Sequence, residues 1–172
     1  MREGVTLPAL RHAPNDSGGH GRVGAGPAHA ECRADRLSWK PHPKSRSLGE
    51  LAVHVANIPS LANPIVEQDE FIPLSTPPPA PESVCDFAAL FEKNLARAEQ
   101  LLGGLTAEHA AGLWRVVFHG KEIFSRPRTA VIRTNILNHL YHHRGRLSVY
   151  LRLLDVAVPI TYGPTADENP FL

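Results

Sequence analysis

Apolar residues recur at the spacing of an α-helix in three segments of this 172-residue chain. In the first segment one face carries four apolar side chains, Leu48, Leu51, Val55 and Ile58. Ser47 and Glu50, at the start of this segment, have the spacing of a capping box, in which the side chain of each residue accepts a hydrogen bond from the backbone N–H of the other. At 100° per residue, His54 falls on the flank of the face, about 60° from Leu51. We therefore predict a helix over 48–59 with a histidine beside its apolar side.

The second and third helices are predicted over residues 83–104 and 127–154. The apolar face of the second consists of Val84, Phe87, Ala88, Phe91, Leu95, Ala98 and Leu102. Gly103 and Gly104 end that helix, and Pro127 suits the first turn of the next. Between the two helices, residues 113–124 indicate a short hairpin around Gly120.

The remaining segments lack helical periodicity. Residues 1–30 combine repeated Gly and Pro with no sustained apolar face, so we expect residues 1–36 to form a flexible or irregular arm. Residues 72–82 predict a stiff, proline-rich linker. The pattern favours one all-α domain over residues 37–172, built as a helical bundle.

Composition excludes several classes of protein. The hydrophobic share of 42% and the net charge of +1 are ordinary for a globular domain, and no basic stripe indicates nucleic-acid binding. No apolar run is long enough to span a membrane, and the N-terminus lacks the apolar core of a signal peptide. Cys32 and Cys85 are too few for a disulfide framework, so we expect reduced thiols in a cytoplasmic protein.

The chain contains ten histidines, and only some of them have positions that indicate a functional site. His139 and His143 are four residues apart on the last predicted helix, so their imidazoles lie on one face about a turn apart. This face is the apolar one, since an arc of about 100° contains Ile136, His139, Leu140, His143, Leu147, Tyr150 and Leu154. His142 lies off the arc, which suits a position at the rim.

A divalent metal ion explains two buried imidazoles that otherwise leave polar nitrogens unsatisfied. Such an ion needs more than two ligands, and His54 is the natural third. Three imidazoles with open positions are typical of catalytic sites, and imidazole favours zinc, nickel or iron(II) over magnesium or calcium. The alternative is that the histidines are hydrogen-bonded core residues, and spacing alone does not join His54 to the pair.

Three stretches resemble signature stretches of the DinB-like superfamily of four-helix-bundle metalloproteins: LGELAVHVANIP, NHLYHHRGRLSVYLRLL and VPITYGPTADE. The similarity runs from about Leu37 to Glu168. It implies an up-down helical bundle whose metal ligands are His54, His139 and His143. It also implies nickel or zinc as the ion and a homodimer as the assembly. Some members of the superfamily transfer a low-molecular-weight thiol to small electrophiles.

The sequence departs from the family pattern at two places. Arg146 stands where the family motif has glutamine, which adds a fixed charge near the histidine pair. The family's first helix precedes Leu37, yet residues 1–30 lack its pattern, so this helix is atypical or missing. We expect either that the arm replaces it or, as the favoured explanation, that a reading-frame error alters the sequence before about residue 33. A bundle of three helices exposes an apolar groove that a partner chain can cover.

Three further residues are candidates for catalysis. Arg144 adjoins the histidine pair and can bind an anion, with a structural salt bridge as the alternative. His142 can act at the rim, and Tyr162 lies in a tail loop that can fold over the metal. For Tyr162 the default is simple loop anchoring.

Three hypotheses for function follow. The first is a metal-dependent thiol transferase acting on small electrophiles. The second is a metal-dependent hydrolase, which is weakened because no carboxylate adjoins the histidine pair as in an HExxH motif. The third is a metal-binding, dimerising stress protein without catalysis.

Overall fold

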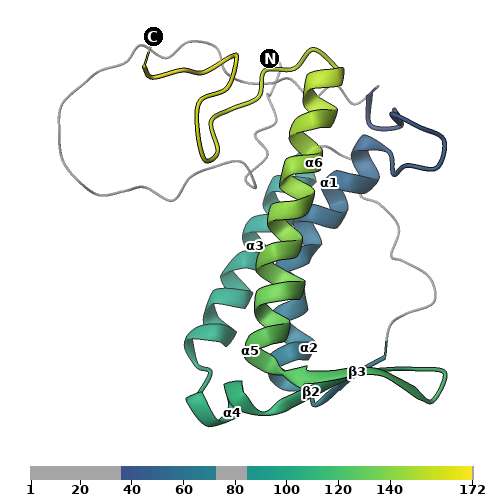
Figure 1. Ribbon diagram of the computed structural model, residues 1–172, viewed down its shortest axis with the longest axis vertical. Coiled ribbons are helices and arrows are strands. Elements are labelled where there is room, and N and C mark those ends of the chain that lie inside the picture. Colours follow the sequence, from purple (N-terminus) through teal and green to yellow (C-terminus); the bar gives the residue numbers. More distant parts are fainter. Residues whose placement is uncertain (1–35, 73–84, 172) are drawn as a thin grey trace.

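The computed structural model describes residues 36–72 and 85–171. Three helical rods lie side by side, with a small sheet at one end (Figure 1). The first rod comprises α1 (Leu48–Asn57), the 3-10 turn η3 (Ile58–Leu61) and α2 (Ala62–Glu67). The second rod is α3 (Cys85–Gly103). The third comprises α5 (Arg128–Val131), the π-helical segment η4 (Ile132–Asn138) and α6 (His139–Leu153).

The capping box at the start of α1 is confirmed. The backbone N–H of Glu50 donates to Ser47 Oγ at 3.1 Å, and the backbone N–H of Ser47 donates to Glu50 Oε2 at 2.6 Å. Lys40 and the Ser47 backbone stabilise the carboxylate, and the backbone hydrogen bond contributes most to lowering the pKa of Glu50. These contacts fix where α1 begins, and with it the position of His54 two turns later.

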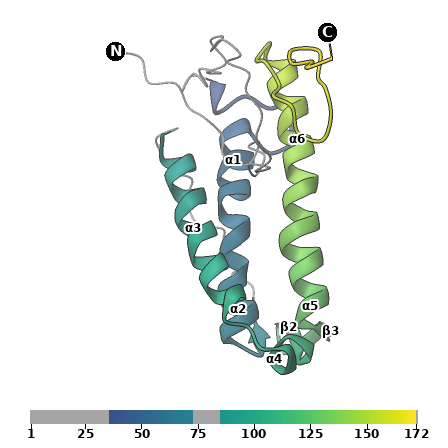
Figure 2. The ribbon, with the colours of Figure 1, turned by 90° about the vertical axis from the view of Figure 1, so that its left-hand side faces the viewer.

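The helices do not follow the expected up-down order. The first rod and α3 both run toward the sheet, whereas the third rod runs away from it (Figure 2). Short connections force neighbouring helices to be antiparallel. The connection between Phe71 and Cys85 is too long to impose that constraint, so the two rods can lie parallel.

The assignment to the all-α class is also wrong, because the chain contains a three-stranded mixed sheet. Strands β2 (Leu113–Phe118) and β3 (Lys121–Pro127) form the expected antiparallel hairpin, with Gly120 at φ +73° in its turn. Strand β1 (Glu70–Phe71) joins the edge of β2 in parallel. Two residues are too few to leave an alternating pattern in the sequence, which is why β1 was not predicted.

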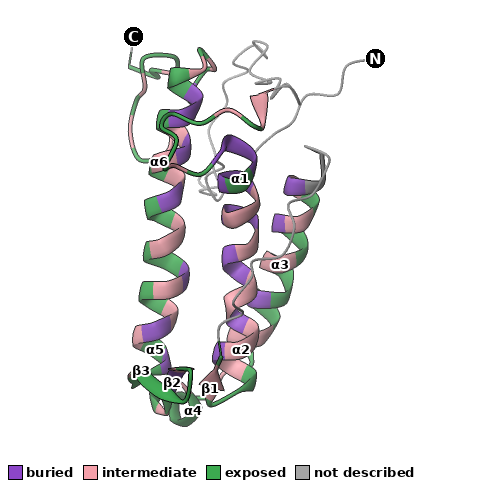
Figure 3. Ribbon diagram, turned by 90° about the vertical axis from the view of Figure 1, so that its right-hand side faces the viewer, coloured by how far each residue is buried: buried purple, intermediate pink, exposed green. Residues whose placement is uncertain are grey.

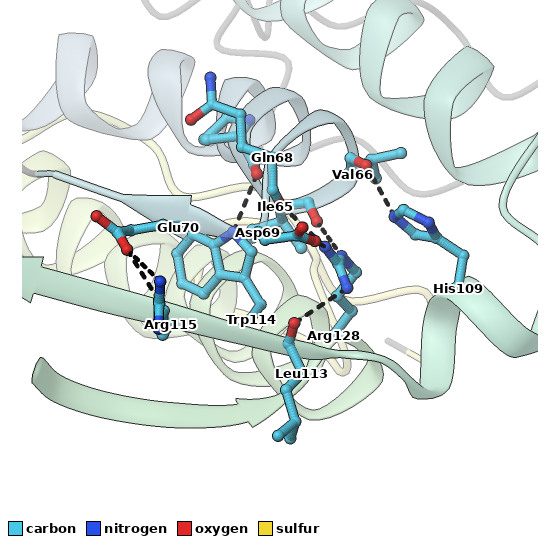
Figure 4. Close-up of polar contacts among 11 residues, drawn as sticks. Ile65, Val66, Gln68, Asp69, Glu70, His109, Leu113, Trp114, Arg115 and Arg128 are labelled. Carbon is cyan, nitrogen blue, oxygen red and sulfur yellow. Dashed lines mark hydrogen bonds and ion pairs between the residues drawn. The ribbon is translucent and has the colours of Figure 1, made fainter.

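One buried side chain joins the sheet to the helices. Arg128, 3% exposed, donates to the backbone carbonyls of Ile65, Gln68 and Leu113 at 2.9 to 3.1 Å and pairs with the carboxylate of Asp69 (Figure 4). Its guanidinium thus satisfies carbonyls from the end of α2 and the start of β2. The nearby Trp114 indole N–H donates to the Pro64 carbonyl at 2.9 Å. The bottom of the third rod is fixed to the first by these bonds.

The helices meet along buried faces that produce two main hydrophobic clusters (Figure 3). The upper cluster contains Leu48, Leu51, Val55, Ala56, Phe91, Leu147 and Tyr150. The lower cluster contains Ile58, Ala62, Ile65, Ala98, Trp114, Val116, Val131 and Ile136. Leu140 packs against both clusters. The residues flanking Leu140 on α6 therefore lie between the two halves of the core.

Several expectations concern residues outside the described part of the chain. These are the N-terminal arm up to residue 35, the atypical first helix, Cys32, residues 73–82 of the proline-rich linker and the first two residues of the second predicted helix, 83–84. Within residues 36–72 and 85–171, no helix combines the length and the apolar character needed to cross a bilayer.

Candidate metal centre

The structure brings three imidazoles together between α1 and α6. His54 Nε2 lies 3.1 Å from His139 Nε2 and 3.0 Å from His143 Nε2, and the latter two atoms are 2.9 Å apart. His54 comes from α1, whereas the other two occupy successive turns of α6. His143 is buried, with 6% of its surface exposed, and the other two are half-buried.

The three rings point their Nε2 atoms toward one another. The ring centroids are 4.4 to 4.9 Å apart, clearly farther than the Nε2 atoms. Together the three residues form a group whose ligand atoms can hold one metal ion.

Hydrogen bonds cannot account for this triangle. A ring nitrogen with a proton only donates, and one without a proton only accepts. Each of the three nitrogens is therefore either a donor or an acceptor, so at least two of them must have the same role. The contact between two donors, or between two acceptors, is repulsive. A cation at the centre removes this conflict, because all three lone pairs then point at it. The residues therefore fit a divalent ion.

The protonation of the group suits ligation as well. Burial lowers the pKa of His54 to about 4 and that of His143 to about 3, with nearby cationic groups adding to the effect. Burial also lowers the pKa of His139, against an opposing hydrogen bond to the Asn135 backbone. At neutral pH the three imidazoles are uncharged, which is the form that binds metals.

Two arginines bring positive charge close to the group. Arg46 contributes to lowering the pKa values of His54 and His139, and Arg146 to those of His54 and His143. Arg146 was noted from the sequence, but Arg46 was missed because it lies before the predicted helix and follows no helical spacing to His54. The hydroxyl of Tyr150 donates to the Arg46 carbonyl at 3.1 Å and holds that segment against α6.

The local backbone explains the position of His139. The π-helical segment η4 ends at Asn138, and α6 begins at His139. The Asn135 backbone also lies close enough to the His139 imidazole to favour its protonated form, which opposes the effect of burial on its pKa. A π-helical turn is uncommon and frequently occurs at functional sites.

The three candidates for catalysis occupy different settings, and only His142 has a contact with the triad. His142 is exposed, with its ring centroid 4.8 Å from that of His143. The guanidinium of Arg144 stacks over the rings of Tyr162 at 4.4 Å and Tyr141 at 5.4 Å. Tyr162 is 74% exposed in the tail loop. These contacts support an anchoring role for Arg144 and Tyr162, and their part in catalysis stays a prediction.

Comparisons with known proteins support the same fold. A DinB-like protein from Bacillus cereus is 26% identical over 75% of this chain and 82% of its own, with a TM-score of 0.54. A DinB-like protein from Bacillus subtilis is 24% identical over 73% of this chain and 81% of its own, with a TM-score of 0.56. No family model matches, and no curated protein matches significantly.

Proposed function

Because the chain belongs to the DinB-like superfamily, we propose that its three imidazoles hold one divalent metal ion that activates a small thiol for transfer to an electrophile. The observation that carries the proposal is the triangle of Nε2 atoms at 2.9 to 3.1 Å. It supplies three neutral ligands from two helices and leaves the remaining coordination positions to other molecules.

The residues of the chain prepare the site in three ways. His54, His139 and His143 stay uncharged at neutral pH because burial lowers their pKa values. Arg46 and Arg146 add positive charge, which favours an anionic sulfur over a neutral thiol. The ion, when bound, supplies Lewis acidity that lowers the pKa of a thiol or water it holds.

The proposed reaction balances without a redox partner. The thiol loses its proton, and the proposed acceptor is the exposed imidazole of His142, whose ring centroid lies 4.8 Å from that of His143. The sulfur then forms a bond to an electrophilic carbon, and the leaving group departs with the electron pair of its former bond. His142 borders the triad without belonging to it, which suits an acceptor exchanging protons with water.

If the Nε2 separations of 2.9 to 3.1 Å are kept when an ion binds, they would suit nickel better than zinc. With metal–nitrogen bonds of about 2.1 Å, Nε2 atoms about 3 Å apart subtend about 90° at the ion. A tetrahedral zinc site with the same bonds separates its nitrogens by about 3.4 Å. Angles near 90° belong to tetragonal and octahedral sites, the first of which is common for Ni²⁺.

The hydrolase hypothesis has less support. No Asp or Glu of the described residues belongs to the group around His54, His139 and His143. A metal-dependent hydrolase normally places a carboxylate beside the bound water as its base. The remaining alternative, a metal-binding protein without catalysis, shares the ligands and differs only in reactivity.

The homodimer implied by the family stays a prediction. The outer side of the third rod exposes Leu137, Tyr141, Val149 and Leu153 at 41 to 57%. These residues recur at every fourth position of the helix, and the position between Tyr141 and Val149 in this series is occupied by Gly145. Light scattering coupled to size-exclusion chromatography measures the mass directly, and a mass of one chain at all concentrations contradicts the prediction.

A turnover assay on the full chain tests the proposed function. The protein is loaded with Ni²⁺, and product is measured with a panel of low-molecular-weight thiols and an aryl chloride as electrophile. We expect product formation that requires the metal and is lost in His54→Ala. Metal-loaded protein that yields no product with any thiol rejects the transferase. A metal-dependent rise in melting temperature without product then favours the non-catalytic alternative.

A further inference from the structure

A hollow of about 480 Å³ opens beside the histidine group. It is lined by Leu61, Thr134, Asn135, Asn138 and His139. Leu61 comes from η3 and the next three from the π-helical segment η4, and these two elements pack against each other. His139 belongs both to the lining and to the triangle of Nε2 atoms. A molecule in the hollow therefore lies next to the ion that the triad would hold.

The polar groups of the lining carry no charge at neutral pH, because burial lowers the pKa of the His139 imidazole and the other polar side chains are two carboxamides and a hydroxyl. Asn135 and Asn138 bring carboxamides, each able to donate and accept. Thr134 lies within 2.9 Å of the Ala130 carbonyl and 2.8 Å of Asn135 Oδ1, so its hydroxyl is partly engaged. Within the described residues, the exposed side chain of Asn138 has no hydrogen-bond partner and is free to bind a ligand.

The lining contrasts with the cationic groups near the triad. Arg46 and Arg146 influence the triad electrostatically but do not line the hollow. Arg144 is stacked on Tyr162 and is also absent from the lining. The positive charge thus acts at the metal end, while the hollow offers amides and one apolar wall from Leu61. Its volume falls in the range of small-molecule sites, about 300 to 1,000 Å³.

We propose that this hollow binds the uncharged, amide-bearing end of the small thiol whose sulfur reaches the metal. The inference rests on the proposed function and adds the chemical class of the thiol. An amide group can donate to a carboxamide oxygen and accept from a carboxamide N–H, which matches Asn135 and Asn138. A short methylene chain between amide and sulfur packs on Leu61. Asn138 and Asn135 then determine which thiol is preferred.

A binding experiment with cobalt-loaded full chain tests this inference without relying on turnover. N-acetylcysteamine and ethanethiol are titrated separately, and the sulfur-to-cobalt absorption band reports ligation. We expect the amide-bearing probe to bind at least about tenfold more tightly. In Asn138→Ala and Asn135→Ala the preference should fall severalfold, with ethanethiol binding unchanged. Asn169→Ala, in the tail loop away from the hollow, serves as the matched control.

The outcomes separate the two proposals. Equal affinity for both thiols, or a preference that survives both asparagine substitutions, overturns the pocket assignment while leaving thiol activation intact. If neither thiol changes the cobalt spectrum, the proposed function fails. The hollow is then tested with N-(2-hydroxyethyl)acetamide, which lacks sulfur. Chemical-shift changes at the Asn135 and Asn138 side-chain amides support an amide site, and unchanged shifts reject it.

Discussion

His54 Nε2 lies 3.0 Å from His143 Nε2, although 89 positions separate the two residues in the chain. Packing of α1 against α6 produces this contact, because Leu51 and Val55 on α1 share a buried cluster with Leu147 and Tyr150 on α6. The hydrophobic faces around the triad therefore set the distance between its ligands. The geometry that the triad offers to a metal ion therefore depends on the fold as much as on the histidines.

Alanine substitution of any one triad histidine should abolish stoichiometric metal binding. Each substitution leaves only two imidazoles to bind the ion. Residues that support the ligands without touching the metal typically change metal affinity 10- to 100-fold, so removing a ligand should lower the affinity by more than about 100-fold. Elemental analysis of purified His54→Ala, His139→Ala and His143→Ala measures the metal content. His42→Ala, which alters an exposed histidine outside the group, should retain about one ion per chain. A variant with full occupancy removes that residue from the ligand set.

Sequence periodicity was sufficient to place the pair on α6. The predicted arc is buried at Ile136, His143, Leu147 and Tyr150, because burial selects apolar residues at the 3.6-residue period. The cap at Ser47 likewise fixed the start of α1. The need for a third ligand pointed to His54, but only the family resemblance joined it to the pair, since no local pattern encodes the packing of one helix on another.

Other features had no local signal. The π-helical segment covers only residues 132–138, which is too short to give a period of its own, so the sequence was interpreted as one continuous α-helix. Arg46 approaches the triad because Tyr150 binds its carbonyl across 104 positions. Arg128 resembles any surface arginine in the sequence, and only the structure shows it buried among carbonyls.

The bound ion should have cis nitrogens near 90°. Nε2 atoms 2.9 to 3.1 Å apart are too close for a regular tetrahedral site with bonds of about 2.1 Å. Cobalt-loaded protein without thiol is therefore expected to show the weak visible absorption of a five- or six-coordinate ion. Competition between equal Ni²⁺ and Zn²⁺ should yield mainly nickel. Intense tetrahedral-type absorption together with preferential zinc loading contradicts this geometry.

The metal-free protein should lose stability as the pH falls from about 6.5 toward 4. The folded-state pKa is lowered to about 4 for His54 and about 3 for His143, against an ordinary value of 6.5. Between these values the unfolded chain binds more protons, so protonation favours unfolding. The contribution is fully present above about 6.5 and is lost as the pH approaches the folded pKa values. Urea unfolding at several pH values measures this.

A matched pair of variants isolates the histidines from the carboxylates that titrate nearby. The double variant His54→Gln/His143→Gln should show a shallower fall in the free energy of unfolding over the same pH range. His42→Gln should retain the wild-type slope. Identical slopes in the double variant and the wild type exclude the triad as the source of the pH dependence.

Replacing Arg128 by methionine should destabilise the fold by about 3 kcal/mol. The substitution keeps the buried stem but leaves carbonyls of Ile65, Gln68 and Leu113 without their donor. Chemical denaturation measures the change. Arg115→Met is the control, because Arg115 pairs with Glu70 at the exposed surface of the same sheet and such pairs contribute about 0 to 1 kcal/mol. Equal effects of the two substitutions show that the buried bonds of Arg128 are not important for stability.

Substitutions at Tyr162 should distinguish anchoring from catalysis. Its ring stacks on the Arg144 guanidinium at 4.4 Å, and the adjoining loop is held by Asp167, which pairs with Arg152. Tyr162→Phe keeps an aromatic face for the cation and should preserve both loop protection and turnover. Tyr162→Leu removes that face, and amide hydrogen exchange at Val158–Glu168 should become several times faster. If Tyr162→Phe abolishes turnover while exchange is unchanged, the hydroxyl takes part in the reaction and anchoring is not its main role.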